Sequence, residues 1–245
     1  MRRVAILIIM QGILLVDKPK GWTSFDVVNY VRKIVATHEG KKPKNCKVGH
    51  TGTLDPAATG LLVLLVGKEY TKRAPELTKL DKTYEVSVKL GDVSTTGDQE
   101  GEITPYAPNG DEFTPIKQPS QDEVERVLQQ FTGEIVQVPP SFSAIKINGK
   151  RAYELARKGQ EVKLEPRKAT IYDIRDVEYA YPTMRFTCDV SSGTYIRSLV
   201  EDIGQALNTG AYMSDLRRTK VGDFSILDTF QVENIDLHTF TGINK

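Results

Sequence analysis

The sequence predicts an α+β fold, because it contains both strand-like and helix-like patterns of apolar residues. Residues 82–90 and 184–190 alternate apolar and polar side chains with the period of two that a strand with one buried face requires. The residues after Thr23 and Ser120 instead repeat apolar side chains every three or four positions, which is typical of amphipathic helices. We therefore expect a sheet with flanking helices.

The first predicted strand includes Ile13 to Val16 and ends in a Pro-Gly turn. A helix then begins at Thr23, because this residue can cap the helix N-terminus and Asp26 stands three residues later, as a capping box requires. The apolar side chains of this helix form one predicted buried face: Val27, Val28, Val31, Ile34 and Val35.

Three further segments have clear patterns. The run from Leu61 to Val66 is apolar throughout and ends at Gly67, which predicts a buried strand. Ser120 and Glu123 form a second capping box, before a helix whose core face comprises Val124, Val127, Leu128 and Phe131. The strand of residues 184–190 leads through a turn into a third helix, whose core face comprises Ile196, Leu199, Val200, Ile203 and Leu207.

Residues 91–112 are acidic and rich in glycine and proline, so we expect a surface loop. The start of this segment is similar to a calcium-binding loop. Its twelfth position, counted from Asp92, is Ile103, where a calcium loop of this kind needs glutamate. The spacing therefore argues against calcium.

Composition bounds the function. Among 245 residues, 39% are hydrophobic and 27% are charged, which indicates a soluble globular chain of one large domain or two small ones. The net charge of +1 excludes bulk basicity as a source of nucleic-acid binding. The cysteines, Cys46 and Cys188, are far apart, so metal or disulfide use is not expected and a cytoplasmic location fits.

The N-terminal apolar run, residues 4–10, is too short to span a membrane, and no small-residue cleavage site follows it. We therefore expect neither a signal peptide nor a membrane anchor. Both Met1 and Met10 are candidate start positions, because the recognisable sequence begins just after Met10.

The most informative stretch is Gly49-His50-Thr51-Gly52-Thr53-Leu54-Asp55-Pro56-Ala57-Ala58-Thr59-Gly60. Gly52 and Gly60 can adopt a positive φ, and Pro56 biases Asp55 towards an extended conformation. An Asp-Pro pair is often only a turn. The alternative is a carboxylate that a rigid loop presents for catalysis.

This string resembles the motif that contains the catalytic aspartate of the TruB family of tRNA pseudouridine synthases. The resemblance extends from Gly12 to about Ile226, in at least five motifs in the family's order. The other motifs include Asp17-Lys18-Pro19-Lys20-Gly21-Trp22-Thr23-Ser24, Lys82-Thr83-Tyr84, the segment from Gly91 to Gly101, and Gly193-Thr194-Tyr195-Ile196-Arg197-Ser198-Leu199.

The resemblance implies the pseudouridine synthase fold, a large mixed and mainly antiparallel sheet with flanking helices and a central RNA-binding cleft. It also implies an enzyme that flips uridine 55 of the TΨC loop out of tRNA and isomerises it to pseudouridine. This reaction needs no redox step and no phosphate energy. The sequence accordingly has neither a GxGxxG nor a GxxxxGK[ST] motif, and we expect no cofactor and no metal.

The resemblance assigns roles to individual residues. Asp55 would be the nucleophile, and an ion pair with Arg197 would oppose the rise in its pKa that burial causes. Tyr84 would stack on the uracil, and a plain alternative is core packing in its strand. His50, Tyr195 and Leu216 would line the uracil pocket.

The same resemblance implies extensive RNA contacts. Lys18 belongs to a motif near the active site, and residues 136–159, with Lys146 and Arg151, match a mobile RNA-gripping insertion. Basic residues in segments 41–47, 146–158 and 217–220 would hold phosphates, although charged loops are also simply well solvated. Arg197 is a cation in the first turn of its helix, where the dipole disfavours it, so we expect an anion nearby. A surface arginine is the alternative.

The expected domain organisation is a catalytic domain over residues 1–228 and a short tail over 229–245, without the complete PUA domain that relatives commonly carry. We expect a monomer with tRNA as its partner, no membrane and no guide RNA. Two rivals remain. One is a non-catalytic RNA-binding or chaperone protein on the same fold, and the other is the archaeal and eukaryotic relative that works in a guide-RNA particle.

Overall fold

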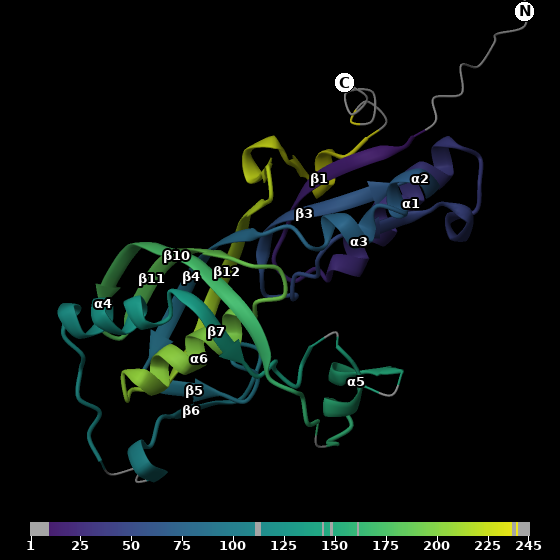
Figure 1. Ribbon diagram of the computed structural model, residues 1–245. Coiled ribbons are helices and arrows are strands. Elements are labelled where there is room, and N and C mark those ends of the chain that lie inside the picture. The colour runs from purple at the N-terminus through teal and green to yellow at the C-terminus, as the bar shows by residue number, and fades with distance from the viewer. Residues whose placement is uncertain are drawn as a thin grey trace, which may run out of the picture. The chain divides into compact units, whose positions relative to one another are not determined.

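The computed structural model describes residues 10–110, 114–143, 145–147, 149–160, 162–236 and 239 (Figure 1). Met1 and most of the expected tail after residue 236 therefore lie outside the described residues. The chain divides into two compact units, Met1–Leu80 with Arg217–Lys245, and Asp81–Leu216. We call them the first and the second unit.

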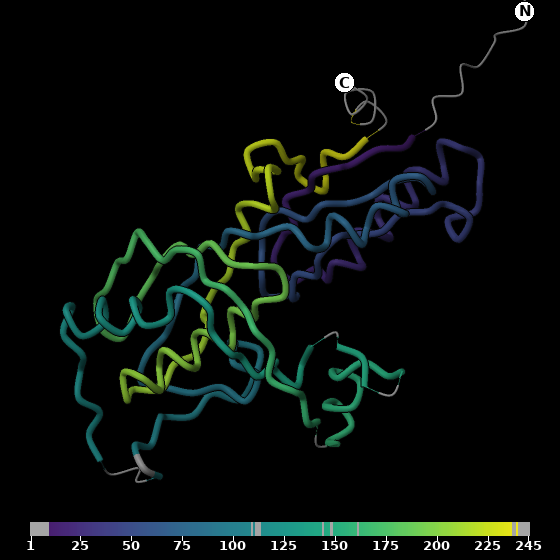
Figure 2. Tube along the Cα trace, in the orientation of Figure 1, coloured from purple at the N-terminus to yellow at the C-terminus, as the bar shows by residue number. Residues whose placement is uncertain are grey.

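The strands of the first unit centre on β3 (Thr59–Val66). β3 pairs with β1 (Gly12–Lys18) and β2 (Val48–His50) in antiparallel fashion, and with the end of β12 (Ala211–Val221) in parallel. A segment near the C-terminus also joins this sheet: β14 (Phe230–Gln231) pairs with β1 in parallel (Figure 2). All six residues from Leu61 to Val66 are at most 1% exposed, so the predicted buried strand is confirmed.

Helix α1 (Ser24–His38) supplies the other half of this core. Its predicted capping box is present, with the Thr23 hydroxyl accepting from the Asp26 amide and the Asp26 carboxylate accepting from the Thr23 amide. Val27, Val28, Val31 and Val35 are buried, while Ile34 is half-buried. The unit is completed by short elements: α2 (Lys68–Thr71), α3 (Ala74–Leu77), β13 (Phe224–Ser225) and the 3₁₀ turns Pro43–Asn45, Ile226–Asp228 and Val232–Asn234.

The second unit has the strand order β12–β4–β11–β10–β7. The bounds are β4 (Lys82–Leu90), β11 (Thr183–Val190), β10 (Arg167–Ala180) and β7 (Gly133–Gln137), and these four pair in antiparallel fashion. Helix α6 (Ile196–Ala206) contacts β4, and α4 (Gln121–Gln130) contacts β10. The predicted alternation of β4 and β11 and the Ser120–Glu123 capping box are confirmed. The predicted α+β fold with a large mixed, mainly antiparallel sheet is thereby confirmed.

The expectation of a plain surface loop at residues 91–112 is wrong. The segment contains the hairpin β5 (Asp92–Ser94) with β6 (Ile103–Pro105), followed by a 3₁₀ turn, Pro108–Gly110. Asp98, between the two strands, is only 2% exposed. Asp111 and Glu112, at the end of the segment, lie outside the described residues.

The predicted RNA-gripping insertion, residues 136–159, has little regular structure. It begins with Val136 and Gln137, the last residues of β7, and holds the two-residue strands β8 (Lys146–Ile147) and β9 (Lys150–Arg151), and helix α5 (Ala152–Ala156). Ala144 and Asn148 lie outside the described residues. Within the described part of the chain, no helix is both long and apolar enough to cross a membrane.

The junction of β3 and β12 gives a test of the fold. Gly60 has a φ of +102°, and a Cβ there would meet the backbone of Arg218, including its carbonyl oxygen and, at 2.8 Å, its nitrogen. Gly60→Ala should therefore lower the free energy of unfolding by at least about 3 kcal/mol, because the backbone must move. Urea denaturation followed by circular dichroism measures this loss.

Gly40→Ala is the matched control, because Gly40 also has a positive φ, +61°, but a Cβ added there would have no heavy atom within 4 Å. This variant should lose only roughly 1–2 kcal/mol, the cost of a left-handed backbone for an L-residue. Equal losses in the two variants would contradict the close approach of Gly60 to β12.

Candidate active site

The Asp55 loop joins β2 to β3 in the first unit. The Ala58 amide donates to the Asp55 carbonyl at 3.1 Å, so the loop makes a tight turn immediately after the aspartate. Thr51, at the start of the loop, donates its amide to the Val63 carbonyl at 3.1 Å. Asp55 itself is half-buried.

The residues on either side of Asp55 are hydrogen-bonded to the start of α1. Ser24 Oγ accepts from the Leu54 amide at 2.8 Å and donates to the Leu54 carbonyl at 3.0 Å. The Gly21 amide donates to the Pro56 carbonyl at 2.8 Å. Ser24 is only 2% exposed, so water does not compete for these bonds. The loop is consequently fixed before any substrate arrives.

Lys18 adds a third attachment. Its side chain is fully buried, and Nζ donates to the carbonyls of Trp22 at 2.7 Å, Pro19 at 3.0 Å and Pro56 at 3.4 Å. A buried ammonium with three acceptors is well satisfied. Lys18 thus ties the turn after β1 to the Asp55 loop. Its expected role in substrate binding stays a prediction.

Two arginines of the basic segment 217–220 bind other parts of the protein, while Lys220 is exposed and its expected phosphate contact stays a prediction. Arg218 is 2% exposed and donates from Nε to the Leu61 carbonyl at 2.8 Å and from Nη2 to the Gly52 carbonyl at 3.0 Å. The expectation that this residue holds a phosphate is wrong, because its guanidinium is buried against the protein backbone. Arg217 forms a bidentate pair with Asp17, at 3.1 and 2.8 Å.

In the second unit, Arg197 lies in the first turn of α6 and is 7% exposed. Nη1 donates to the Thr96 carbonyl at 3.1 Å, and Nη2 donates to the Phe142 carbonyl at 2.8 Å. Nη1 also lies 3.6 Å from Asp98 Oδ2. The anion that the helix-dipole argument required is therefore present in the described structure, on the β5–β6 hairpin.

Asp98 is itself held in place. Its Oδ1 accepts from the Thr96 hydroxyl at 2.6 Å and from the Glu100 amide at 3.1 Å. Both donors fix the position of this carboxylate beside Arg197. A second acid, Glu201, lies on the next turn of α6. Burial raises the pKa of its carboxyl, and the nearby Arg197 opposes the rise. The Arg197 side chain therefore has a fixed anionic partner in Asp98.

The tyrosines of the predicted site are well ordered by their neighbours. Tyr84 is 8% exposed, pairs with Cys188 across β4 and β11, and shares the buried face of β4 with Val86. Tyr195 is the N-cap residue of α6, and its backbone exchanges two hydrogen bonds with the Gln137 side chain, at 3.1 and 3.2 Å. Gln137 thereby joins the end of β7 to the start of α6.

The remaining predicted residues differ in exposure. His50 ends β2 and is half-buried, and Leu216 is 7% exposed in β12. Lys146 and Arg151 are exposed and lie opposite each other in the β8–β9 pair. The guanidinium carbons of Arg151 and Arg157 lie 6.0 and 5.5 Å from the centre of the Tyr153 ring, so the insertion does combine bases with an aromatic platform, as predicted.

Neither cysteine offers a reactive thiolate. Burial raises the pKa of Cys188 to about 12, and burial also raises the pKa of Cys46. Among the described residues, no group of three His, Cys, Asp or Glu side chains has the arrangement of a metal site. Asp55, on a loop whose backbone is fixed on both sides, stays the candidate nucleophile.

The predicted site residues are divided between the two units. Lys18, His50 and Asp55 belong to the first unit, and the second contains Tyr84, Lys146, Arg151, Tyr195, Arg197 and Leu216. That the two sets meet around a uracil stays a prediction. Sequence reasoning missed the supporting residues Ser24, Asp98, Gln137 and Arg218. Ser24 and Asp98 stand inside recognised motifs, whereas nothing in the sequence marks Gln137.

Comparison with known proteins places these motifs in a family. Residues 39–196 match the model of the TruB family pseudouridylate synthase N-terminal domain, and residues 197–242 match the model of the tRNA pseudouridylate synthase B C-terminal domain. The chain is 44% identical to tRNA pseudouridine synthase B of Clostridium kluyveri, over 93% of this chain and 73% of the relative. It is 43% identical to the protein of the same name from Phocaeicola vulgatus, over 91% and 90%.

Solved structures show the same fold. A chain in the crystal structure of a Cbf5-Nop10-Gar1 complex is 31% identical and superposes with a TM-score of 0.65, over 94% of this chain and 53% of that one. A chain in the structure of an H/ACA RNP bound to a substrate RNA containing 2′-deoxyuridine is 27% identical, with a TM-score of 0.64, over 95% and 54%. This chain spans about half the length of either. On the strength of the two domain matches and the curated relatives, the chain belongs to the TruB family of pseudouridylate synthases.

Proposed function

We propose that this chain is a tRNA pseudouridine synthase that isomerises uridine 55 in the TΨC loop. The observation that carries the proposal is the Asp55 loop, whose residues Leu54 and Pro56 are hydrogen-bonded to Ser24, Gly21 and Lys18. Relatives that are 43–44% identical are named tRNA pseudouridine synthase B. A rigid, half-buried carboxylate in this family suits the isomerisation of a nucleotide that has been flipped from its stack.

The reaction exchanges one glycosidic bond for another. The bond between uracil N1 and ribose C1′ breaks, the uracil turns, and a bond forms between C5 and C1′. The proton on C5 leaves, and N1 gains a proton, so the overall change is an isomerisation without a redox step. Asp55 is the proposed nucleophile, because hydrogen bonds hold the backbone of its two neighbours in place and a carboxylate can form the covalent intermediate that divides the reaction into two steps.

Arg197 is the proposed partner of the Asp55 carboxylate. A cation beside a carboxylate stabilises the ionised form, which a nucleophile needs. The two carbonyl acceptors and Asp98 fix the Arg197 guanidinium, so it can act without a large rearrangement. Asp55 and Arg197 belong to different units, and their meeting in one cleft is part of this proposal.

The other residues would hold the flipped nucleotide. Tyr84 would stack on the uracil and assist removal of the C5 proton. His50, Tyr195 and Leu216 would line the pocket. Lys18 would support the Asp55 loop through its hydrogen bond to the Pro56 carbonyl. Exposed bases on the insertion, Lys146 and Arg151 among them, and at residues 41–47 would bind the phosphates.

Similarity to structures of H/ACA particles keeps a guide-dependent activity as the second candidate. A tRNA transcript made without any other component separates the two. Tritium release from 5-³H-uridine in that transcript, by the purified chain alone, supports the stand-alone enzyme. Release that requires a guide RNA or partner proteins would favour the second candidate.

Asp55→Asn tests the nucleophile. The substitution keeps the shape of the side chain and removes its charge, and an amide is a far weaker nucleophile than a carboxylate. We expect tritium release to fall on the order of 10³-fold or more, while tRNA binding in a filter assay persists, because affinity comes mainly from phosphate contacts.

Asp122→Asn is the matched control, since this exposed aspartate lies in the first turn of α4, in the other unit. It should keep near-normal release. Near-normal release by Asp55→Asn would refute the nucleophile assignment. A circular dichroism spectrum of each variant shows whether folding is intact.

The insertion gives a second test. Residues 136–159 carry exposed bases and exposed apolar side chains, Val136 and Val138, at 66% and 58%. We expect the amides that follow the end of β7 to exchange rapidly in the free protein and to gain protection with tRNA, because phosphate contacts offset the entropy of ordering. Hydrogen–deuterium exchange measures this, with α4 as an internal reference whose protection should not change. Equal exchange of the insertion with and without tRNA would count against its gripping role.

A further inference from the structure

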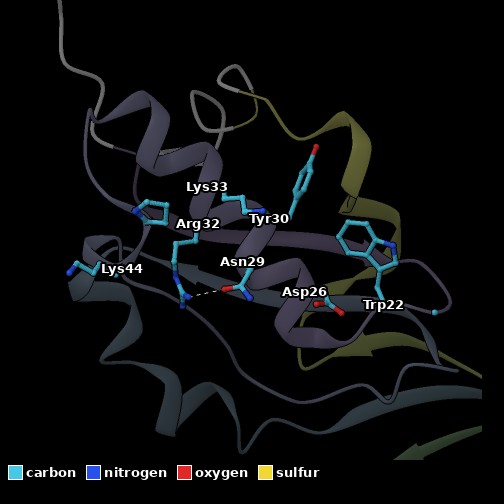
Figure 3. A pocket seen from close by; sticks show the side chains of 9 residues that line it. Trp22, Asp26, Asn29, Tyr30, Arg32, Lys33 and Lys44 are labelled. Atoms are coloured by element: carbon cyan, nitrogen blue, oxygen red, sulfur yellow. Dashed lines mark hydrogen bonds between the residues drawn. The ribbon is translucent and has the colours of Figure 1, made fainter.

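A second feature of the first unit is a cavity on the outer face of α1, the face opposite the buried valines. Its volume is about 680 Å³, within the range of sites that bind small organic groups. We call it the α1 pocket, bounded by Trp22, Asp26, Tyr30, Arg32, Lys33 and Lys44 (Figure 3).

The aromatic side of the α1 pocket is rigid. The rings of Trp22 and Tyr30 meet edge to face, with centroids 5.9 Å apart and planes at 73°. Both rings pack half-buried against the core of the first unit, so each is held from behind while part of it lines the cavity. Because the rings are steeply inclined, a base can stack on the face of one ring while the other ring borders it, and such stacking accepts any base.

The other side of the pocket is cationic. Arg32 donates from Nη1 to Asn29 Oδ1 at 2.9 Å, drawn in Figure 3, and from Nη2 to the Val48 carbonyl at 3.1 Å. Each of these nitrogens keeps a second N–H for a ligand. Lys33 and Lys44 are exposed, and neither is paired with an acid among the described residues. The pocket lining therefore contains three cations and one carboxylate, Asp26, which already accepts hydrogen bonds from Thr23.

The order of these groups fits one nucleotide. Asp26, Tyr30 and Lys33 follow one another along a single face of α1, over about 10 Å at the rise of an α-helix. Trp22 lies at one end of this line and Lys44 beyond the other, as Figure 3 shows. A base against the rings and a phosphate against the cations would match the pocket in both shape and charge.

The pocket also adjoins the Asp55 loop. Its rim at Gly21 and Trp22 is the segment whose backbone is bound to Pro56, through the Gly21 amide and through Lys18 Nζ. An RNA chain that presents a nucleotide to Asp55 therefore has a second binding place within reach, on the same rigid framework.

We propose that the α1 pocket binds an unstacked nucleotide of the tRNA, other than the reacting uridine, with its base on Trp22 and Tyr30 and its phosphate on Arg32, Lys33 and Lys44. The proposal rests on the proposed function and extends it, because the reaction itself assigns no role to Trp22, Tyr30 or Lys33. The pocket would steady the RNA while a neighbouring segment enters the active site.

Trp22 is the only tryptophan of the chain, so its fluorescence reports on the pocket alone. The experiment titrates tRNA transcript into the full chain and follows tryptophan emission. It is repeated with the double variant Lys33→Glu/Lys44→Glu, with Lys68→Glu as the control. Lys68 is an exposed lysine of α2, in the same unit and outside the pocket. Steady-state tritium release is measured for the same three proteins.

We expect saturable quenching by tRNA in the wild type and in Lys68→Glu. The double variant should lose the quenching and show a KM for tRNA about tenfold higher, since two phosphate contacts are removed and replaced by repulsion. The dependence of log affinity on log salt should also become shallower by about one to two. Unchanged quenching and KM in the double variant would overturn the proposal.

Free nucleotides complete the test. Uridine or adenosine monophosphate at millimolar concentration should quench weakly or not at all, because one nucleotide lacks the rest of the RNA. Quenching by a free nucleotide at concentrations as low as those of tRNA would overturn the assignment to RNA. Wild-type tritium release separates the two levels of inference: if it is absent, the proposed function fails, and if it is present without quenching, only the pocket assignment fails.

Discussion

The position of the Asp55 loop depends on hydrogen bonds between its backbone and the segment from Lys18 to Ser24, which leads into α1. Ser24 pairs with both backbone groups of Leu54, and Gly21 and Lys18 hold the carbonyl of Pro56. These contacts lie on either side of the aspartate and fix the backbone of its two neighbours. A nucleophile held in this way need not be ordered when the substrate binds, which lowers the entropic part of the barrier.

Buried arginines serve the same end in both units. Arg218 satisfies carbonyls of Gly52 and Leu61 at the foot of the loop, and Arg197 satisfies those of Thr96 and Phe142. Burying a guanidinium is costly unless its donors are matched, and here each has at least two carbonyl acceptors. The chain therefore uses cations for internal support, so a count of its basic residues overstates the number that is available to bind phosphates.

The α1 helix has two distinct faces. Its valines complete the core of the first unit, and its first turn fixes the Asp55 loop. The α1 pocket on its outer face combines two half-buried rings with three cations, of which Trp22 and Lys44 come from neighbouring segments, and core packing alone does not require this combination. One helix would then couple a place where RNA is held to the place where it reacts, through the short segment from Lys18 to Ser24.

The sequence by itself determined the helices with capping boxes, the alternating strands and the family motif around Asp55, because these depend on neighbours in the chain. Period, caps and the Gly-Pro loop are local, and the family motifs are contiguous strings. Only the tertiary structure decided that Lys18 and Arg218 are buried supports, that Asp98 stands beside Arg197, and that Gln137 clamps Tyr195. Each of these residues makes a contact with a residue that is 38 or more positions away in the chain. No local pattern specifies which distant carbonyl a buried cation will reach.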